Sequence, residues 1–179
     1  TTDSAGNIYI GGTILGQVTF GSMPNSPVLQ AQNLDGFIAK IDSTGNWLWA
    51  TSFDTATNND SNSSGVTGLD IDPVSGDLIV SGTHKGPTDF DGTIISNADS
   101  EFFITVLNPN TGSVSWVSTA GGIGDDNSGG VVVDSYGAIW QTGTTSGTFS
   151  ADGKTHQAVS QADTILVKWN QQGAVQSVK

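Results

Sequence analysis

Short apolar runs separated by polar, glycine-rich segments make up the whole chain of 179 residues. The runs are rich in Ile, Val, Phe, Trp and Thr, and no segment has the apolar period of 3.6 that a helix requires. Residues 8–10 and 78–80 are continuously apolar, which predicts strands covered on both faces. In residues 37–41 the alternation places Lys40 on the face opposite Phe37. The pattern therefore predicts an all-β protein.

Two sequence phrases each occur three times, in the same order and at nearly the same separation. The first phrase starts with Asp and ends with Gly-Thr, and it occupies residues 3–13, 72–83 and 134–144. The second phrase joins an apolar run to a turn and a further apolar run, and it occupies residues 37–49, 103–116 and 165–177. Such repetition indicates one supersecondary unit copied three times.

Tight turns connect the apolar runs within each unit. The turns open with Asp or Asn and close with Gly: Asp3 with Gly6, Asp42 with Gly45, Asp72 with Gly76, Asn108 with Gly112, Asp134 with Gly137, and Asn170 with Gly173. The first side chain accepts a backbone N–H ahead of it, and Gly supplies the backbone angle that other residues avoid. A complete unit is therefore predicted to hold four antiparallel strands, as in residues 66–72, 78–83, 102–108 and 114–119.

Four-stranded antiparallel units in tandem are typical of β-propeller blades. We expect a first blade in residues 1–53 that lacks most of its first strand, a second blade in residues 65–119 and a third in residues 127–179. Residues 54–64 and 120–126 are expected to be inter-blade loops. Propellers close with roughly four to eight blades. About three blades therefore predict an open structure, completed by missing blades of a larger propeller or by other copies of this chain.

The composition excludes several classes of protein. Five Lys and no Arg cannot build the basic face that a nucleic acid requires. The absence of Cys excludes disulfides, a thiol nucleophile and a Cys-ligated zinc site. No apolar run approaches the ~18 residues of a membrane helix, so no membrane insertion is expected. A net charge of -12 with a surface of Asp, Asn, Gly, Ser and Thr favours an extracellular or bacterial cell-surface location.

The repeated phrases closely resemble the SBBP family of bacterial β-propeller repeats. The resemblance rests on Gly-Asn-Ile-Tyr-Ile-Gly-Gly-Thr at residues 6–13, Asp-Gly-Phe-Ile-Ala-Lys-Ile-Asp at 35–42 and Gly-Asn-Trp-Leu-Trp at 45–49. It covers nearly the whole chain and departs at Ser177, where the strand Trp is missing, and at an insertion at residues 110–111. The resemblance implies a propeller on exported or surface proteins and no catalytic residues.

Two acidic segments are the candidate metal sites, and calcium is the candidate cofactor. Asp89 and Asp91 flank Phe90 and precede a Gly, like the start of a calcium loop, but a third ligand and a distal Glu are missing. Asp125 and Asp126 lie in an expected inter-blade loop. The alternative for both pairs is an ordinary solvated acidic turn.

The histidines and tryptophans have simple structural interpretations. His84 and His156 lack a neighbouring nucleophile motif, which argues against a catalytic triad. The tryptophans are expected to pack between blades, with stacking on a sugar as the alternative: Trp47, Trp49, Trp116, Trp140 and Trp169.

These observations predict a non-enzymatic surface module for adhesion, matrix or fibre assembly, or protein interaction. One alternative is a piece of a quinoprotein-type propeller enzyme, because residues 41–49 and 107–116 look like that family's tryptophan docking motif. That motif is a packing device, and a quinone's carboxylates would need cationic ligands such as Arg, which is absent. The other alternative is a propeller lectin that binds a glycan through loops at one rim.

Overall fold

The computed structural model describes residues 1–55 and 61–179, and these residues form fifteen strands and no helix. The prediction of an all-β protein is confirmed. The strands in chain order are β1 (Ile8–Thr19), β2 (Val28–Ile41), β3 (Trp47–Thr55), β4 (Ser63–Ile71), β5 (Leu78–Lys85), β6 (Thr88–Phe90), β7 (Thr93–Ile95), β8 (Glu101–Leu107), β9 (Val114–Ile123), β10 (Asp126–Val133), β11 (Ile139–Thr145), β12 (Thr148–Ala151), β13 (Lys154–Gln157), β14 (Asp163–Trp169) and β15 (Val175–Val178).

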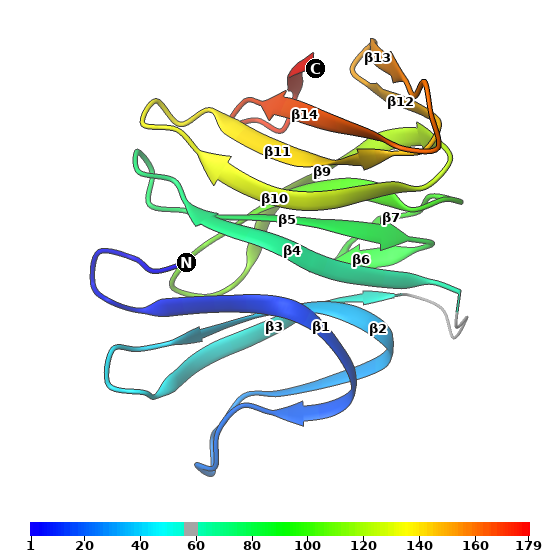
Figure 1. The fold of residues 1–179 in the computed structure, drawn as a ribbon. Helices are drawn as coiled ribbons and strands as arrows, with labels where there is room; N and C mark the ends of the chain where they lie inside the picture. The colour runs from blue at the N-terminus through cyan, green and yellow to red at the C-terminus, as the bar shows by residue number, and fades with distance from the viewer. Residues whose placement is uncertain (56–60) are drawn as a thin grey trace.

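Three antiparallel meanders follow one another along the chain. The first is β1–β2–β3, the second is β4–β5–β8–β9 and the third is β10–β11–β14–β15. Hydrogen bonds join the first two meanders and two small hairpins into an eleven-stranded sheet, while the third forms a four-stranded sheet. The meanders lie one above another, with β1, β4 and β10 side by side (Figure 1). The sheets of the described residues form no closed barrel or ring.

Two hairpins that the sequence pattern did not predict connect successive meanders. The hairpin β6–β7 pairs with β3, and the hairpin β12–β13 pairs with β9. Each hairpin thus follows the second strand of its own meander but adds to the last strand of the meander before it. In the first meander the corresponding stretch simply prolongs the pairing of β1 with β2, with a register shift between Ile14 and Gly16.

This pairing also corrects the expected loops. The strand β9 continues to Ile123, because residues 121–123 pair with β12, so most of the segment 120–126 is extended strand. In the segment 54–64, β3 reaches Thr55 and β4 begins at Ser63, and residues 56–60 lie outside the described residues.

Two hydrophobic cores lie between successive meanders. The core between the first and second meanders contains Tyr9, Ile38, Phe53, Val66, Leu78, Val80, Phe90, Phe103 and Leu107. The core between the second and third contains Ile79, Phe102, Ile104, Val106, Ala120, Val133, Ile139, Phe149, Ile165, Val167, Trp169 and Val175. Since neighbouring residues of a strand point to opposite faces, β5 and β8 contribute side chains to both cores. The prediction that residues 78–80 are covered on both faces is therefore confirmed.

Polar contacts pin the meanders together beside these cores. Asp70 of β4 accepts the backbone N–H of Val133 on β10 at 2.8 Å. The side-chain amide of Gln141 donates to the backbone oxygen of Phe103 at 3.0 Å. The Gln141 side chain is completely buried, so its bond replaces the water that burial removes.

The outer face of β1 differs from the equivalent face of β5. Ile8 and Ile10 are 42% and 37% exposed, although residues 78–80 of β5 are fully buried. Their counterparts Leu78 and Val80 face the core shared with the first meander, whereas no described meander packs on the matching face of β1. The expectation that residues 8–10 are covered on both faces is therefore wrong for these two isoleucines.

Replacing Gly143 should disrupt the packing between the second and third meanders. A Cβ at Gly143 would overlap the ring of Phe102 and the backbone oxygen of Asn127. We expect Gly143→Ala to lower the free energy of unfolding by about 2–3 kcal/mol, because overpacking forces the ring or the backbone to move. Chemical denaturation measures the change. Gly130→Ala is the control, since no atom lies within 4 Å of a Cβ there. Equal destabilisation by both variants would contradict the prediction.

Candidate functional site

Six turns gather at the end of the molecule that lies to the left in Figure 1. In each, the opening Asp or Asn accepts the N–H of the residue two positions ahead, and the closing Gly has a φ between 75° and 92°. The predicted turn chemistry is therefore confirmed. These turns carry the contacts by which one meander recognises the next.

Three polar side chains of the first meander converge on one carbonyl oxygen of the second. The oxygen belongs to Pro109, in the turn between β8 and β9. Lys40 Nζ donates to it at 2.9 Å and Trp49 Nε1 at 3.2 Å, and the oxygen of the Tyr9 hydroxyl lies 3.4 Å away. A positive charge and a neutral donor on one acceptor form a strong, charge-assisted site for a main-chain turn.

Asp3 holds these donors in place. Its Oδ2 accepts the Tyr9 hydroxyl at 3.0 Å and lies 3.5 Å from Lys40 Nζ, which is 4.9 Å from the centre of the Tyr9 ring. Burial raises the pKa of Asp3, but hydrogen bonds from Asn7, Tyr9 and Ala5 outweigh it and lower the pKa to about 2. Burial and Asp3 raise the pKa of Tyr9, so its hydroxyl remains a donor.

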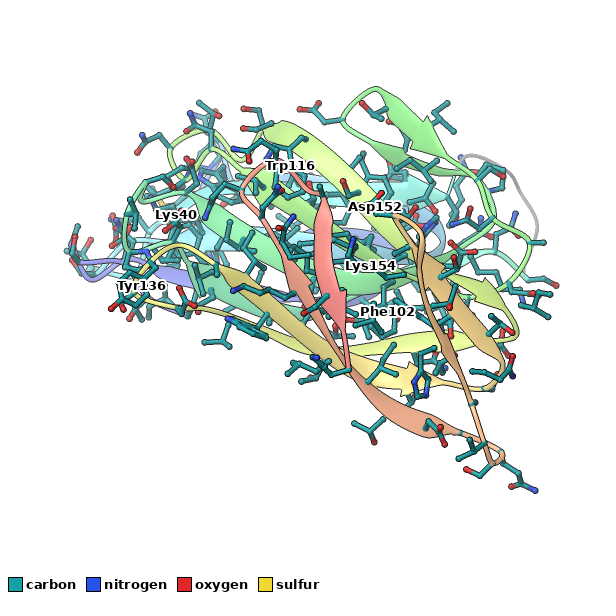
Figure 2. All side chains as sticks on the ribbon, turned by 90° about the horizontal axis from the view of Figure 1, so that it is seen from above. Lys40, Phe102, Trp116, Tyr136, Asp152 and Lys154 are labelled. Atoms are coloured by element: carbon teal, nitrogen blue, oxygen red, sulfur yellow. The ribbon has the colours of Figure 1, made fainter. Side chains whose placement is uncertain are left out.

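Lys40 lies on the strand face opposite Phe37, as alternation predicted, together with Ile38 of the core shared with the second meander. On this face its side chain is only 6% exposed. The turn at Pro109 and the carboxylate of Asp3 cover it, because the next meander packs on this face. Figure 2 shows Lys40 at the turn end of the molecule, where Tyr136 of the third meander also lies.

We call the contact between two successive meanders a joint. At each of the two joints, a tryptophan of one meander covers a glycine of the following meander. A Cβ at Gly112 would lie 2.7 Å from the Trp49 ring, and one at Gly173 would lie 2.9 Å from the Trp116 ring. Both glycines close turns between the last two strands of a meander. The predicted packing role of Trp49 and Trp116 is confirmed.

The other tryptophans have different neighbours. Trp47 meets Phe20 edge-on with ring centres 5.1 Å apart, and Trp169 is buried in the core between the second and third meanders. Trp140 is half-buried beneath Lys168, and these two residues belong to a group that repeats the first meander.

The third meander reproduces the donor group of the first. Asp134, Trp140 and Lys168 occupy the positions of Asp3, Tyr9 and Lys40 in the strand pairing. Trp140 Nε1 donates to Asp134 Oδ2 at 3.1 Å, and Lys168 Nζ is 4.8 Å from the Trp140 ring centre. The hydrogen bond from Trp140 is the main cause that lowers the pKa of Asp134, so the carboxylate stays ionised.

A hollow of about 400 Å³ lies beside this second group, and its lining includes Lys168, Gln171 and the 90% exposed Tyr136. The second meander carries Ile79 and Val106 at the two matching positions. The charged group is therefore specific to the first and third meanders rather than a requirement of the repeat.

The structure assigns hairpin contacts to the first predicted calcium pair. Asp89 accepts the N–H of Gly92 at 2.6 Å. Asp91, whose backbone φ is 53°, accepts the N–H of Val114 at 3.1 Å. Asp54 lies opposite Asp89 in the pairing of β3 with β6. Asp91 thus ties the hairpin β6–β7 to the first residue of β9.

The second predicted pair separates into a surface residue and a buried one. Asp125 accepts the N–H of Ser100 at 3.3 Å and lies 3.9 Å from Lys85 on the surface. Asp126 is completely buried and accepts the N–H of Gly122 at 2.9 Å. Burial raises the pKa of Asp126 and of its neighbour Glu101, and carboxylates nearby raise both further.

No three His, Asp or Glu side chains within residues 1–55 and 61–179 are grouped so that they could hold a metal ion. Calcium binding at Asp89, Asp91, Asp125 and Asp126 remains a prediction. Sequence reasoning missed Asp99 and Glu101, which approach the second pair from β8 and the loop before it.

The two histidines lie in different environments. His84 is fully buried between the rings of Phe90 and Phe103, with Nε2 3.0 Å from the Asn97 amide. His156 lies 3.1 Å from Asp163 and is partly exposed. Among the described residues, neither histidine has a serine or threonine hydroxyl as a hydrogen-bond partner.

Comparisons with known proteins give no family. No protein-family model matches the sequence, and no curated protein is significantly similar to it. The described residues contain no helix that is long and apolar enough to cross a membrane.

His84 should make the stability of the protein depend on pH. Burial lowers its pKa from 6.5 to about 4, so below pH 6.5 the unfolded state binds more protons than the folded state. The contribution of His84 to stability should therefore be complete above pH 6.5 and should fall by about 2–3 kcal/mol as the pH approaches 4.

The measurement is urea denaturation between pH 4 and 7. His84→Gln should flatten this part of the profile, and His156→Gln is the matched control that should retain it. A profile for His84→Gln as steep as that of the wild type would refute the assignment.

Proposed function

We propose that this chain is a non-enzymatic interaction module of a secreted or cell-surface protein, built from three successive β-propeller blades. The blades are residues 1–53, 65–119 and 127–179, and each overlaps one of the three meanders. The observation that carries the proposal is the repeated joint. At both joints a Trp on the last strand of one meander covers the turn Gly of the next, and a hairpin adds to that same strand.

The strand count supports the propeller interpretation. The second and third meanders have four antiparallel strands each, and the first has three strands preceded by Thr2, which bridges to Ile8 where a fourth would run. Small sheets that pack face to face through alternating side chains are the arrangement of propeller blades. The resemblance to SBBP repeats points in the same direction. The partners are then the rest of a larger propeller or other copies of the chain.

The charge supports an extracellular or cell-surface setting. A net charge of -12 with only five lysines keeps such a chain soluble through mutual repulsion, and salt or divalent cations outside the cell would screen it. An interaction module of this kind acts by binding a partner rather than by catalysing a reaction.

A glycan is the second candidate ligand, and one observation favours it. The exposed ring of Tyr136 lies beside a hollow lined by amide side chains of Gln171, Gln172 and Gln176. Aromatic rings and amides are a suitable combination for a sugar. The quinoprotein alternative gains less support, because the Trp–Gly contacts of its docking motif are fully used in packing.

Three assays on the purified chain test the proposed function. We expect labelled chain to be retained on intact bacterial cells or on their released polymer, saturably and in competition with unlabelled chain. A soluble protein of similar negative charge is the control. We expect no reduction of a redox dye after addition of pyrroloquinoline quinone and calcium. Dye reduction without saturable retention would overturn the proposal, and quenching of Trp fluorescence by one member of a glycan panel would identify the lectin instead.

A further inference from the structure

The two end meanders carry the two halves of a joint that the molecule already uses internally. At the joint of the first and second meanders, Asp3, Tyr9 and Lys40 hold the turn that contains Pro109. The third meander repeats this group as Asp134, Trp140 and Lys168, beside the hollow that holds Tyr136. This surface has the geometry and donors of a site for a turn carbonyl.

The matching turn lies on the first meander, in residues 42–46. Ser43 follows Asp42 in this turn as Pro109 follows Asn108 in the turn of the second meander. The closing Gly45 has a φ of 92°, like the other turn glycines, but nothing described lies within 4 Å of its Cβ position. Its counterparts Gly112 and Gly173 lie under Trp49 and Trp116.

We infer that the end of the third meander binds the turn at residues 42–46 of a second copy of this chain, head to tail. Lys168 Nζ donates to the carbonyl oxygen of Ser43, and the Trp140 ring lines the contact. The two halves lie at opposite ends of the stack of meanders (Figure 1). A contact between unlike surfaces repeats from copy to copy and forms a ring or a filament. This inference rests on the proposed function, whose partner it specifies.

Ser177 makes this contact weaker than the internal joints. It occupies the register position of Trp49 and Trp116, since these three residues pair with Lys168, Lys40 and Val106 respectively. An indole at this position would lie over Gly45 of the second copy, as the indoles of the internal joints lie over their glycines. Ser177→Trp should therefore strengthen association by completing the joint.

Sedimentation velocity and light scattering of the full chain across a wide concentration range test the inference. We expect the mass to rise with concentration and to rise more steeply in high salt, because both copies are acidic. Ser177→Trp should tighten association about tenfold or more, since buried Trp residues dominate interface energies. Lys168→Met, which keeps the aliphatic stem over Trp140, should weaken it by about tenfold.

Two matched substitutions give the specificity of the test. Ser115→Trp adds the same side chain at an exposed position of β9, and Lys85→Met removes the same charge from the surface near Asp125. Neither should change association, and circular dichroism should show all four variants to be folded. The inference is overturned if wild type and Ser177→Trp remain monomeric throughout, or if a control variant shifts association as much as its counterpart. A monomer that still binds cells would overturn this contact alone and leave the proposed function standing.

Discussion

The fold depends on the burial of each small sheet between its neighbours. A three- or four-stranded meander with this much Gly, Ser and Thr has too little apolar surface to form a core on its own. The second meander solves this by alternation. Leu78 and Val80 of β5 face the first meander, while Ile79 faces the third. The meanders are therefore mutually dependent, and every contact described at the turn end is secondary to this stacking.

Phenylalanine rings fill the space between successive meanders, and they come from different positions at the two joints. In the first meander Gly36 pairs with Phe53, and in the second Phe102 pairs with Ala120, so the ring moves to the other strand of the same cross-strand pair. The hairpin ring follows it, because Phe90 packs on Phe53 and Phe149 packs on Phe102. One large and one small residue per pair preserves the volume between the sheets, which dense packing requires.

The strands within each meander could be predicted because their signals are local. Turn-forming Asx residues, closing glycines and short apolar runs lie within a few residues of one another, and threefold repetition made the boundaries clear. The hairpins β6–β7 and β12–β13 could not be predicted in this way. Their strands have three or four residues, several of them polar, and they are stabilised by pairing with a different meander. The recurring Phe90 and Phe149, each followed by an Asp-Gly pair at residues 91–92 and 152–153, were the signals that marked these places in the sequence.

The same distinction applies to the candidate site. The chemistry of Asp89, Asp91, Asp125 and Asp126 suggested a cation, but the structure shows all four accepting backbone N–H groups that fix hairpins and linkers. The residues that recognise the next meander were harder to find.

Alternation placed Lys40 on the correct strand face, but its contact with Pro109, 69 positions away, could not be predicted from alternation alone. A comparison of the repeats position by position would have found the signal, since Lys40 and Lys168 coincide where the second meander carries Val106.

Directionality is the physical consequence of this arrangement. Each joint uses the last strand and donor group of one meander and the turn and hairpin of the next, so its two surfaces differ in shape and chemistry. A stack built from such joints has unlike ends, in contrast to a pair of identical faces related by a two-fold axis. Its two end faces also differ, because the first meander leaves Ile8 and Ile10 half-exposed on its outer face while the third carries Trp140 and Lys168 there. Stacking through unlike surfaces can continue in one direction with the same contacts. The contacts that hold three meanders together within one chain are therefore of a type that can also join separate chains.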